Sequence, residues 1–420
     1  MTPAPAHPAE AEEAARLLRS TAAIRERSGQ LLERARAGHS KWFEVDEGRL
    51  PQAAQMVADL TRQRYPEGRI PFHSRWRHLE AGGADRRAEL ERMLGRVPDA
   101  VRGEALFDLA FVSVLLDAGA GPDWKYVEPA TGQAFARSEG LAVASFHAFT
   151  AGLFSSDRDR PWQVDAQGLR ALVTDHLAAA FQVRGNNPLV GLEGRTVLLR
   201  RLGEVMQEQP EVFGDAVQRP AGIYRQIVSP APDAPRTAEV RAHDILSQIL
   251  LSCAGIWPAG NAIGPVPLGD CWRHEAVRGE GLTDGWMPFH KLSQWLTYSL
   301  LEPFAWSGVQ VRGVDELTAL PEYRNGGLLL DIGVLRLRDE AAAHATWQPG
   351  DELVVEWRAL TVALLDELAV AVRRRLDLDE QQLPLACVLE GGTWAAGREL
   401  ATRLRGGLPP LKVASDGTVF

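Results

Sequence analysis

Three carboxylates lie in surroundings where a negative charge is costly, and they are the best catalytic candidates in this chain. Glu322 precedes an aromatic residue, an arginine and a Gly-Gly turn, Asp331 lies inside an apolar run, and Asp270 belongs to a loop rich in glycine and proline. A buried carboxylate is either paired with a cation or kept for chemistry, such as stabilising a developing positive charge or activating water. Pairing of Glu322 or Asp331 is the structural alternative, and the candidate partners are Arg324, Arg336 and Arg338.

The loop of residues 256–274 is a candidate pocket wall. It is too long for a simple connection and too apolar to be disordered, and loops of this kind in compact proteins usually serve a function. Its prolines stiffen the backbone, and its glycines let the backbone approach a ligand closely. The flat or polar side chains that we expect to line the pocket are Trp257, Asn261, Asp270, Trp272 and His274.

A polar stripe marks the helix that we expect to begin at Pro288. Apolar residues recur at helical spacing on one face, and His290, Lys291 and Gln294 lie beside them. Such a stripe on an amphipathic helix is often only the solvated face. We keep both interpretations, a solvated stripe and a ligand-binding one.

Cys271 and His274 have the Cys-x-x-His spacing of a zinc ligand pair, but the chain offers no second compact pair. We therefore expect no metal and no cofactor. The sequence also lacks a Gly-x-Ser-x-Gly elbow, a Walker loop and a strand-linked Gly-x-Gly-x-x-Gly motif. These absences disfavour the common serine hydrolase, nucleotide triphosphatase and dinucleotide-binding classes.

Helical periodicity recurs along most of the chain and predicts a mainly α protein with few, short strands. We expect a disordered tail at residues 1–10 and a single helical catalytic domain at 11–420; a proline-rich stretch at 226–236 is the best candidate linker. A strand is expected at 42–46. The expected helices cover residues 10–37, 50–64, 106–116, 138–153, 168–181, 192–207 and 237–253, and a further one begins at 288.

Composition excludes several classes of partner. The 420 residues include 46 Lys and Arg against 55 Asp and Glu, a formal charge of −9, with the two signs interspersed. This disfavours a protein that binds a nucleic-acid backbone. The longest apolar runs fall short of the roughly twenty residues that span a bilayer. The N-terminus lacks a secretory pattern, and three scattered cysteines fit a reducing compartment, so we expect a cytoplasmic protein with free thiols.

Two other segments draw notice. Residues 69–78 combine basic residues, histidines and aromatics and could hold an anion, although a surface turn with Trp76 fixed in the core is the more ordinary interpretation. Residues 388–398 place small residues around Trp394, which suggests tight helix packing.

Several long strings of this sequence resemble the uracil-catabolism protein four family, the domain of unknown function numbered 1688. The resemblance covers nearly the whole chain after the N-terminal tail. The strings that carry it are GNNPLVGLEGR (185–195), IWPAGNAIGPVPLGDCWRH (256–274), PFHKLSQWLTYSLLEPF (288–304), LPEYRNGGLLLDIGVL (320–335), LEGGTWAAGRELA (389–401) and SDGTVF (415–420).

That resemblance implies a role in a pathway that converts uracil to its nucleotide, opens the pyrimidine ring and ends in urea. The step expected for this protein is hydrolysis of the N-ribosidic bond of a ribosylurea-type intermediate that carries a 5′-phosphate. Segments 289–296 and 317–329 also resemble the queuosine-salvage nucleotide hydrolases, which have a DNA-glycosylase-like helical fold. In that pattern Glu322 matches an acidic residue before Tyr-Arg, whereas Ser299 stands where the preceding helix has an acidic residue.

The chemistry of ribosyl C–N cleavage assigns an expected role to each candidate. Glu322 is the first choice for the catalytic carboxylate, because positive charge builds on the sugar, and Asp270 and Asp331 come second. The tryptophans would close the pocket, amides would bind the urea or base edge, and cations would hold the phosphate. The full set of expected substrate-binding residues is Trp257, Asn261, Trp272, His274, His290, Lys291, Gln294, Tyr323 and Arg324.

A second class of function stays open at this point. The chain could be a non-catalytic protein that binds a pyrimidine metabolite or a partner enzyme of the uracil degradation pathway, because binding and catalysis both need a pocket. The expected partner is a small pyrimidine-derived ribosyl compound rather than a nucleic acid or a membrane. A homo-oligomer is compatible with the sequence but is not indicated by it.

Overall fold

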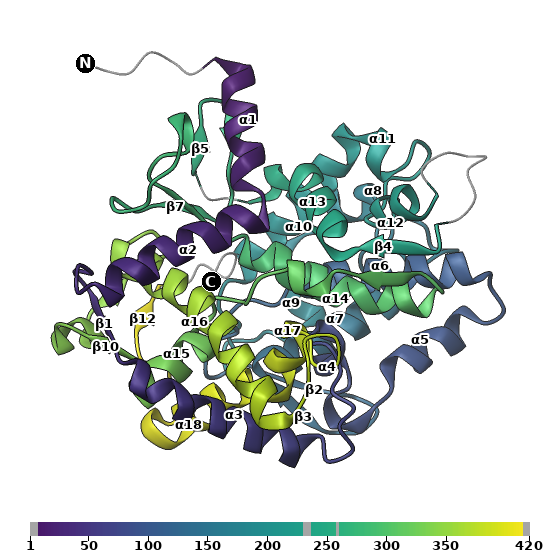
Figure 1. Cartoon of the computed structure of the whole chain (residues 1–420). Helices are drawn as coiled ribbons and strands as arrows, with labels where there is room; N and C mark the ends of the chain where they lie inside the picture. Colours follow the sequence, from purple (N-terminus) through teal and green to yellow (C-terminus); the bar gives the residue numbers. More distant parts are fainter. Residues whose placement is uncertain (1–6, 230–236, 258–259, 415–420) are drawn as a thin grey trace. The chain divides into compact units, whose positions relative to one another are not determined.

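The computed structural model describes residues 7–229, 237–257 and 260–414 of the chain. Helices make up most of these residues, and their strands are only two or three residues long (Figure 1). The predicted mainly α fold is confirmed. Two compact units are present: the first comprises Met1–His73, Ala259–Gln294 and Gly313–Ala414, and the second comprises Ser74–Pro258, Trp295–Arg312 and Ser415–Phe420. The single domain expected for residues 11–420 stays a prediction.

The first unit contains both ends of the described chain and most of the predicted site. Its helices are α1 (Pro8–Leu18), α2 (Thr21–Arg36), α3 (Leu50–Arg64), α15 (Tyr323–Ile332), α16 (Glu352–Leu376), α17 (Leu385–Val388) and α18 (Trp394–Arg405), with a π-helical turn η7 (Leu389–Thr393) and the 3-10 turns η1 (Glu47–Arg49), η4 (Gly281–Thr283), η5 (Val314–Glu316) and η6 (Glu340–His344). Its strands form pairs: β1 (Phe43–Val45) with β10 (Leu335–Leu337), β5 (Ala262–Ile263) with β6 (Val266–Pro267), and β7 (Cys271–Arg273) with β8 (Trp286–Pro288), all antiparallel, and β11 (Thr346–Trp347) with β12 (Lys412–Val413) in parallel.

Helix α16 is the centre of the first unit. It is 25 residues long and buried along most of its length. Helices α2, α3 and α15 pack directly against it. Part of this core is formed by Ile24, Leu31, Val277, Met287, Phe289, Val355, Ala359 and Val362. Any charged side chain on the buried part of α16 therefore needs a partner within the unit.

Helix α1 packs against residues 262–274 of the apolar loop. This loop folds into the β5–β6 hairpin and strand β7, not into an open loop. A second apolar cluster joins the two segments and consists of Ala11, Ala14, Ala15, Leu18, Ile263, Val266, Leu268, Cys271 and Trp286. Packing on α1 thus accounts for much of the apolar character of this segment.

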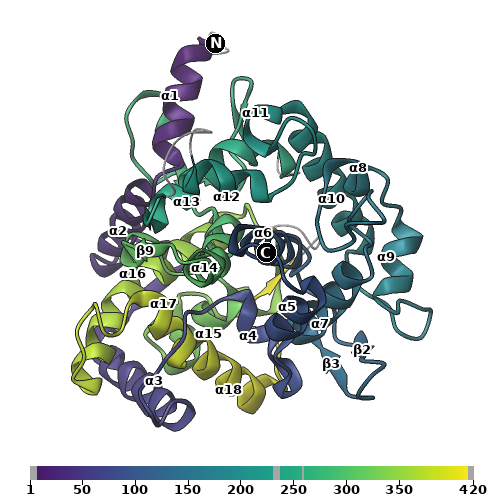
Figure 2. The same cartoon turned by 90° about the vertical axis from the view of Figure 1, so that its right-hand side faces the viewer.

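The second unit is built around helix α6 (Asp99–Leu115), which α4 (Arg75–Leu79), α5 (Arg86–Leu94), α7 (Arg137–Thr150), α10 (Leu192–Glu208) and α12 (Ala221–Val228) contact (Figure 2). Its other helices are α8 (Ala166–Arg170), α9 (Thr174–Ala180), α11 (Pro210–Phe213), α13 (Ala242–Ser252) and most of α14 (Lys291–Trp306), with the 3-10 turns η2 (Ala81–Gly83) and η3 (Ala254–Ile256). Strands β2 (Lys125–Val127) and β3 (Ala134–Ala136) pair antiparallel, and β4 (Glu239–Arg241) pairs parallel with β9 (Gln310–Arg312).

Several helices differ from their predicted bounds for local reasons. The helix expected at 10–37 is two helices, because Ser20 caps α2 by accepting a hydrogen bond of 3.1 Å from the Ala23 N–H. The helix expected at 168–181 is likewise split into α8 and α9, and the one expected at 237–253 begins at Ala242, after strand β4. The expected strand at 42–46 and the helix at 50–64 are present as β1 and α3.

The ends of two other predicted segments lie partly outside the described residues. Residues 1–6 of the expected tail are outside them, whereas Pro8 to Glu10 belong to α1. The expected linker at 226–236 begins within α12, and its residues 230–236 lie outside the described part.

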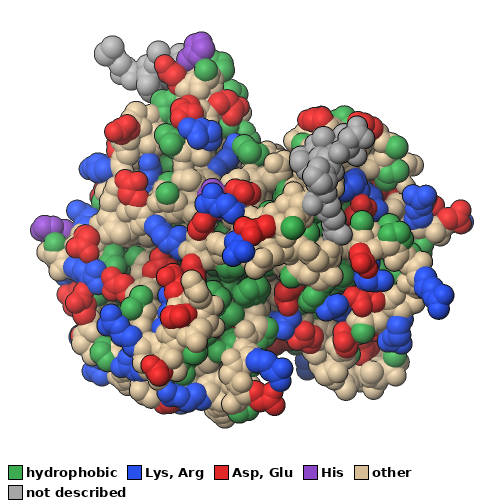
Figure 3. Space-filling view, turned by 45° about the vertical axis from the view of Figure 1, so that its right-hand side comes forward, with side chains coloured by type: hydrophobic (Ala, Val, Ile, Leu, Met, Phe, Trp, Pro, Cys, Tyr) green, Lys and Arg blue, Asp and Glu red, His purple; other side chains and the backbone are tan. Residues whose placement is uncertain are grey.

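The surface agrees with the mixed charge of the sequence. On the face shown in Figure 3, basic and acidic side chains are interspersed, without a broad area of one sign. Among the helices of the described residues, none combines the length and the apolar character needed to cross a bilayer.

Candidate functional site

Asp270 lies just before strand β7 and is held as a buried anion. Arg358 on α16 binds it with both terminal nitrogens, at 2.8 Å to Oδ1 and 2.7 Å to Oδ2. Trp272 Nε1 donates to Oδ1 at 2.7 Å, and the Lys291 backbone N–H donates to Oδ2 at 2.9 Å. Burial would raise the pKa of Asp270, but the charge and hydrogen bonds of Arg358 outweigh it and hold that pKa at about 2. Asp270 is therefore ionised and fully engaged at neutral pH.

The first residue of helix α14 connects Asp270 with Glu322. The backbone N–H of Lys291 binds Asp270, as described, while its side-chain charge lowers the pKa of Glu322. His290, immediately before it, has a left-handed backbone angle (φ 49°). This conformation is why α14 begins at Lys291 and not at the predicted Pro288, which belongs to strand β8.

Glu322 caps the start of helix α15 with its carboxylate. Its Oε2 accepts the Arg324 N–H at 2.7 Å, and its Oε1 accepts the Asn325 N–H at 2.6 Å. Burial raises the pKa of Glu322 above its ordinary value of 4.5, and the two N–H groups with the charges of Lys291 and Arg324 offset only part of that effect. Each oxygen accepts one of these bonds, so each keeps a lone pair for another partner.

The position of Glu322 is fixed by close helix packing. A Cβ atom on Gly397 of α18 would lie 2.0 Å from the Arg324 carbonyl oxygen, and one on Gly326 would lie 2.7 Å from the Trp357 ring of α16. Glycine at both positions lets α15 approach its two neighbours. Trp357 Nε1 also donates to the Gly326 carbonyl at 3.2 Å. The first turn of α15 is thus clamped between α16 and α18.

That first turn also holds two buried polar atoms without a hydrogen-bond partner in the described part of the chain, Arg324 Nε and Asn325 Oδ1. Other atoms of these side chains are engaged: Arg324 Nη1 donates to the Gly407 carbonyl at 3.3 Å, and Asn325 Nδ2 donates to the Leu320 carbonyl at 3.1 Å. The guanidinium also lies 4.7 Å from the centre of the half-exposed Tyr323 ring. Buried polar atoms normally have partners, so this turn is suited to a polar ligand.

Gln294 and His290 are buried and already bonded to protein groups. Gln294 Oε1 accepts the Thr318 N–H at 2.9 Å, and its Nε2 donates to the Thr318 hydroxyl. His290 Nε2 donates to the Leu18 carbonyl at 3.0 Å, and burial lowers its pKa, so the ring is neutral at pH 7. Their expected roles toward a substrate stay predictions, while the bonds seen here tie α14 to its neighbours.

Trp272 lies on strand β7, and the buried His274 follows directly after that strand. His274 Nδ1 accepts the Ala276 N–H at 3.1 Å, so the proton is on Nε2, which lies 3.2 Å from Glu356 Oε2 on α16. The other Glu356 oxygen binds the Ser40 hydroxyl. Trp272, besides its bond to Asp270, lies over Gly350, where an added Cβ would come within 2.7 Å of the ring. Both residues adjoin the Asp270 site without a contact to Glu322 in the described structure.

Asn261 and Trp257 lie near the start of the same loop. Asn261 Nδ2 is another of the buried atoms that lack a hydrogen-bond partner among the described residues. Trp257 follows the 3-10 turn η3 in the second unit, and the next two residues lie outside the described part. The predicted convergence of Trp257 with the rest of the site stays a prediction.

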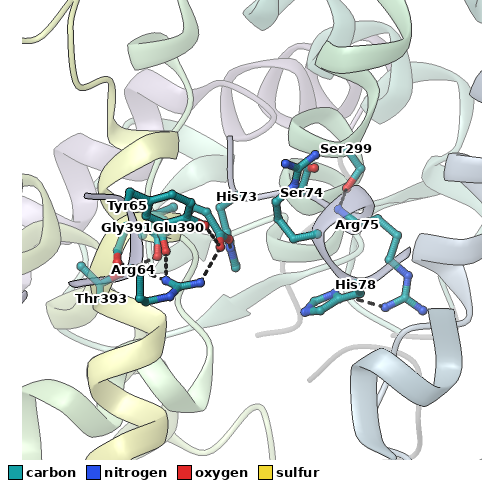
Figure 4. A network of polar contacts seen from close by, with 12 residues as sticks. Arg64, Tyr65, His73, Ser74, Arg75, His78, Ser299, Glu390, Gly391 and Thr393 are labelled. Atoms are coloured by element: carbon teal, nitrogen blue, oxygen red, sulfur yellow. Dashed lines mark hydrogen bonds and ion pairs between the residues drawn. The ribbon is translucent and has the colours of Figure 1, made fainter. Parts of the chain in front are cut away.

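Asp331 and Ser299 have structural partners. Arg405 Nη2 on α18 donates to Asp331 Oδ2 at 2.6 Å, the pairing that the sequence left open as an alternative to catalysis. Ser299, where the resemblance would place an acidic residue, accepts the Arg75 N–H at 2.9 Å in the second unit (Figure 4). An acidic residue does lie one turn further along α14, but Glu302 pairs with Arg77 at 2.7 Å.

No group of three or more histidine, cysteine or acidic side chains is placed to hold a metal within residues 7–229, 237–257 and 260–414. Of the pair considered for zinc, His274 lies against Glu356, whereas Cys271 belongs to the apolar cluster beside α1, where burial raises the pKa of its thiol. All three cysteines are buried thiols.

Sequence reasoning missed the two residues of α16 that organise this site. Glu356 and Arg358 lie in an otherwise apolar run between Leu353 and Val362, and both are almost fully buried. Charges at such positions in a helix that is apolar on all sides would have been the indication of buried pairing. Their partners are 82 and 88 residues away in the chain.

The fold and this site define a class of protein. It is mainly helical, and two carboxylates lie close to a lysine and to arginines at the starts of helices α14 and α15. Within that class the chain belongs to the family described as Protein of unknown function (DUF1688), whose family model matches residues 17–420.

Two relatives agree with that assignment over almost their full length. The chain is 40% identical over 407 residues to Protein urg3 of Schizosaccharomyces pombe, which covers 94% of this chain and 96% of the relative. It is 36% identical over 433 residues to Uracil catabolism protein 4 of Lachancea kluyveri, which covers 96% of this chain and 98% of the relative.

Proposed function

We propose that this protein acts in uracil catabolism and hydrolyses the N-ribosidic bond of a ribosylurea-type intermediate that carries a 5′-phosphate. The name of the Lachancea kluyveri relative supports the pathway. The observation that carries the reaction is Glu322, a carboxylate with a raised pKa that is clamped at a helix start beside a lysine and two unpartnered polar atoms.

The three candidate carboxylates are not equivalent for this chemistry. Asp270 and Asp331 each bind an arginine side chain, at 2.7 Å and 2.6 Å. Glu322 forms no ion pair within 4.0 Å in the described structure, and backbone N–H groups alone hold its oxygens. An anion already neutralised by a bidentate arginine has little left to offer a developing cation. Glu322 is not bound by an arginine side chain in the described structure, and each of its oxygens keeps a lone pair.

The proposed reaction is a displacement by water at the anomeric carbon of ribose. The C1′–N bond breaks, positive charge spreads over C1′ and the ring oxygen, and a water oxygen forms the new bond to C1′. Glu322 stabilises that charge and accepts a proton from the attacking water, while the departing nitrogen takes up a proton from solvent to give urea. Glu322 then releases its proton to solvent, so one water is consumed overall. The sugar product is ribose 5-phosphate. A raised pKa suits Glu322 to this task because it makes the carboxylate a stronger base.

The cations around Glu322 suit the phosphate end of the substrate. Lys291 is the first residue of α14, and its charge lowers the pKa of Glu322. Arg324 Nε is a buried donor without a protein acceptor in the described part of the chain. Arg324 can therefore donate to a ligand without giving up its bond to Gly407. Asn325 Oδ1, an acceptor, complements the N–H groups of a urea.

The competing function is a non-catalytic binding protein, and one observation favours it. A carboxylate that accepts two N–H groups at a helix start is a stabilising cap, whether or not it also reacts. Under that alternative the same polar atoms would bind a pyrimidine-derived metabolite without turnover.

Urea release separates these alternatives. The purified full-length protein is incubated with ribosylurea 5′-phosphate or with unphosphorylated ribosylurea, and urea and the free sugar are quantified over time. The proposal predicts equal amounts of urea and sugar, with faster release from the phosphorylated compound. Saturable binding of either compound without urea would instead establish the binding protein, and release of urea from neither, without binding, would reject both.

A further inference from the structure

The segment of residues 315–320 leads into Glu322 and is held by side chains from other parts of the first unit. It begins in the 3-10 turn η5 and continues without regular secondary structure toward α15. Its residues from Leu317 to Leu320 are at most 2% exposed. A buried irregular segment must find partners for its backbone N–H and C=O groups outside a helix or sheet. These partners help to fix the place from which Glu322 projects.

Arg25 on helix α2 binds the first half of this segment. Its Nη1 donates to the Glu316 carbonyl at 2.9 Å, and its Nη2 donates to the carbonyls of Asp315 at 2.9 Å and of Leu317 at 2.7 Å. Its Nε donates to Asp366 on α16 at 3.1 Å. One guanidinium, itself held by a carboxylate, thus binds three consecutive carbonyls of the segment.

Gln294 on helix α14 binds the second half. Its Oε1 accepts the Thr318 N–H at 2.9 Å, and its Nε2 donates to the Thr318 hydroxyl and, at 3.4 Å, to the Phe289 carbonyl. The side chain is completely buried. The sequence suggests the urea or base edge of a substrate as the partner of this amide, but both of its ends bind Thr318. An effect of Gln294 on the reaction would therefore pass through Thr318.

The Leu320 carbonyl connects this segment with the first turn of α15. It accepts the Glu322 N–H at 2.9 Å and Asn325 Nδ2 at 3.1 Å. The Asn325 N–H in turn donates to the Glu322 carboxylate at 2.6 Å. A displacement of Thr318 is thus passed to Glu322 along four residues of bonded chain.

Gln294 also lies one helical turn after Lys291, and residues three apart share a face of a helix. The Gln294 N–H donates to the His290 carbonyl at 2.9 Å, which closes this first turn of α14. The charge of Lys291 lowers the pKa of Glu322. One turn of α14 therefore carries Lys291 and also holds the segment that leads to Glu322.

We infer that Gln294 is a positioning residue, which keeps Glu322 at a fixed distance from Lys291 through its two hydrogen bonds to Thr318. Reacting groups need to be held within about 0.5 Å of their productive geometry, and the residues behind them supply that rigidity. The role of Gln294 in catalysis rests on the proposed function, whereas the position of Glu322 can be measured without turnover.

Gln294→Met tests this role, because methionine keeps the length of the side chain and removes both bonds to Thr318. The pKa of Glu322 is measured by NMR titration of full-length protein that is isotope-labelled at the glutamate carboxyl carbon, and Glu322→Gln identifies its signal. We predict a higher pKa of Glu322 in Gln294→Met, because Glu322 is then no longer held near Lys291, whose charge lowers that pKa. An unchanged pKa in the folded variant would overturn the inference.

Kinetics separate positioning from contact with the substrate. For ribosylurea 5′-phosphate, Gln294→Met should lower kcat about tenfold and leave KM within about twofold, because a displaced Glu322 acts less well in the transition state. A raised KM with an unchanged kcat would mean that Gln294 contacts the substrate, and would overturn the positioning role. Thr318→Ser retains the hydroxyl and the N–H, so it should keep the kcat and the Glu322 pKa of the wild type.

Two further variants show whether the effect belongs to this segment. Gln163→Met is the matched control, because Gln163 is a buried glutamine of the second unit whose Nε2 donates to Asp165 at 3.2 Å. It should change neither value, and changes equal to those of Gln294→Met would overturn the inference. Arg25→Lys keeps the charge but not the planar fork that binds three carbonyls, so it should lower kcat and raise the Glu322 pKa.

Arg25→Lys also decides the matter if Gln294→Met does not fold. Arg25 is partly exposed, and an unchanged kcat together with an unchanged Glu322 pKa in its variant would then overturn the inference. Failure of the proposed hydrolysis looks different. A wild-type protein that releases no urea would reject the reaction, yet a higher pKa of Glu322 in Gln294→Met would still establish that Gln294 positions Glu322.

Discussion

Asp270 is a buried carboxylate and Glu322 a half-buried one; both lie in the first unit and interact with Lys291, but their partners differ. Asp270 is bound by a bidentate arginine, an indole N–H and a backbone N–H, which hold its pKa at about 2. Glu322 has backbone N–H groups as its hydrogen-bond donors, and burial raises its pKa. The difference separates an anion used to build the site from one left available for chemistry.

This contrast follows from where each cation lies. Arg358 projects from helix α16 and stacks 4.1 Å over the Phe289 ring, and both of its terminal nitrogens bind Asp270. Lys291 and Arg324 lower the pKa of Glu322 through their charges without forming an ion pair to it within 4.0 Å in the described structure. In the proposed function, these two cations bind the phosphate of the substrate.

The largest expected effect is the loss of stability when the ion pair between Asp270 and Arg358 is broken. Arg358→Leu leaves Asp270 buried without its counter-charge and should lower the free energy of unfolding by about 3–5 kcal/mol. Chemical denaturation measures this loss. The matched control is Arg336→Leu, which breaks a surface pair with Asp46 whose side chains are 58% and 31% exposed, and should cost only about 0–1 kcal/mol. Equal losses in the two variants would show that the Asp270 pair is not structural.

Removing the charge of Glu322 should lower the rate of the reaction and leave the fold largely unchanged. Glu322→Gln keeps the shape of the side chain but removes the charge that opposes the developing cation, so turnover should fall about a hundredfold or more. Urea release under saturating substrate gives the rate, and circular dichroism checks the fold. Asp85→Asn is the control, because Asp85 caps helix α5 with a bond of 2.9 Å to the Ala88 N–H. A similar loss of rate in that variant would attribute the effect to helix capping.

Because the pKa of Asp270 is low in the folded protein, the free energy of unfolding should decrease at acidic pH. A carboxylate whose folded pKa is about 2, against an ordinary value of 3.8, contributes stability that is complete above pH 3.8 and is lost as pH falls toward 2. The difference corresponds to about 2 kcal/mol. The wild type should therefore lose more unfolding free energy between pH 5 and pH 3 than Asp270→Asn does. The same acid loss in both proteins would mean that other groups cause it.

The smallest expected effect is on substrate affinity. Lys291→Ala removes a cation proposed for the phosphate, so KM for ribosylurea 5′-phosphate should rise about tenfold, while KM for unphosphorylated ribosylurea should hardly change. The variant should also raise the pKa of Glu322 further, because the Lys291 charge lowers it. An equal rise in KM for both compounds would remove Lys291 from the phosphate site.

Local rules of sequence predicted the mainly helical fold and some elements well. Helix α3 was predicted at its observed bounds because Pro51 suits a first turn and the apolar period is clear. The same period continues through α1 and α2, so periodicity alone could not show the break at Ser20. The start of α14 depended on the left-handed backbone of His290, which no residue preference indicates.

The candidate carboxylates of the site could be predicted from the sequence, but the residues that bind them could not. Glu322 and Asp270 could be named from their apolar surroundings, but Arg358 lies 88 residues from Asp270, and only the folded chain shows that they bind. Glutamate is also not among the usual helix-capping residues, so the capping role of Glu322 gave no local indication. The partner of Asp331 proved to be Arg405 and not one of the three arginines named as candidates.

The most direct test of the central claim is the pH dependence of kcat/KM for urea release from ribosylurea 5′-phosphate, followed in the wild type over the range where the protein stays folded. The account predicts that the rate falls on the acid side with a pKa above 4.5, the ordinary value for glutamate, because Glu322 must be ionised to act. Glu322→Gln should lose both the rate and this acid limb. A wild-type rate that is flat down to pH 4, or a Glu322→Gln variant that keeps the same profile and most of the rate, would contradict the assignment of Glu322 as the reactive carboxylate.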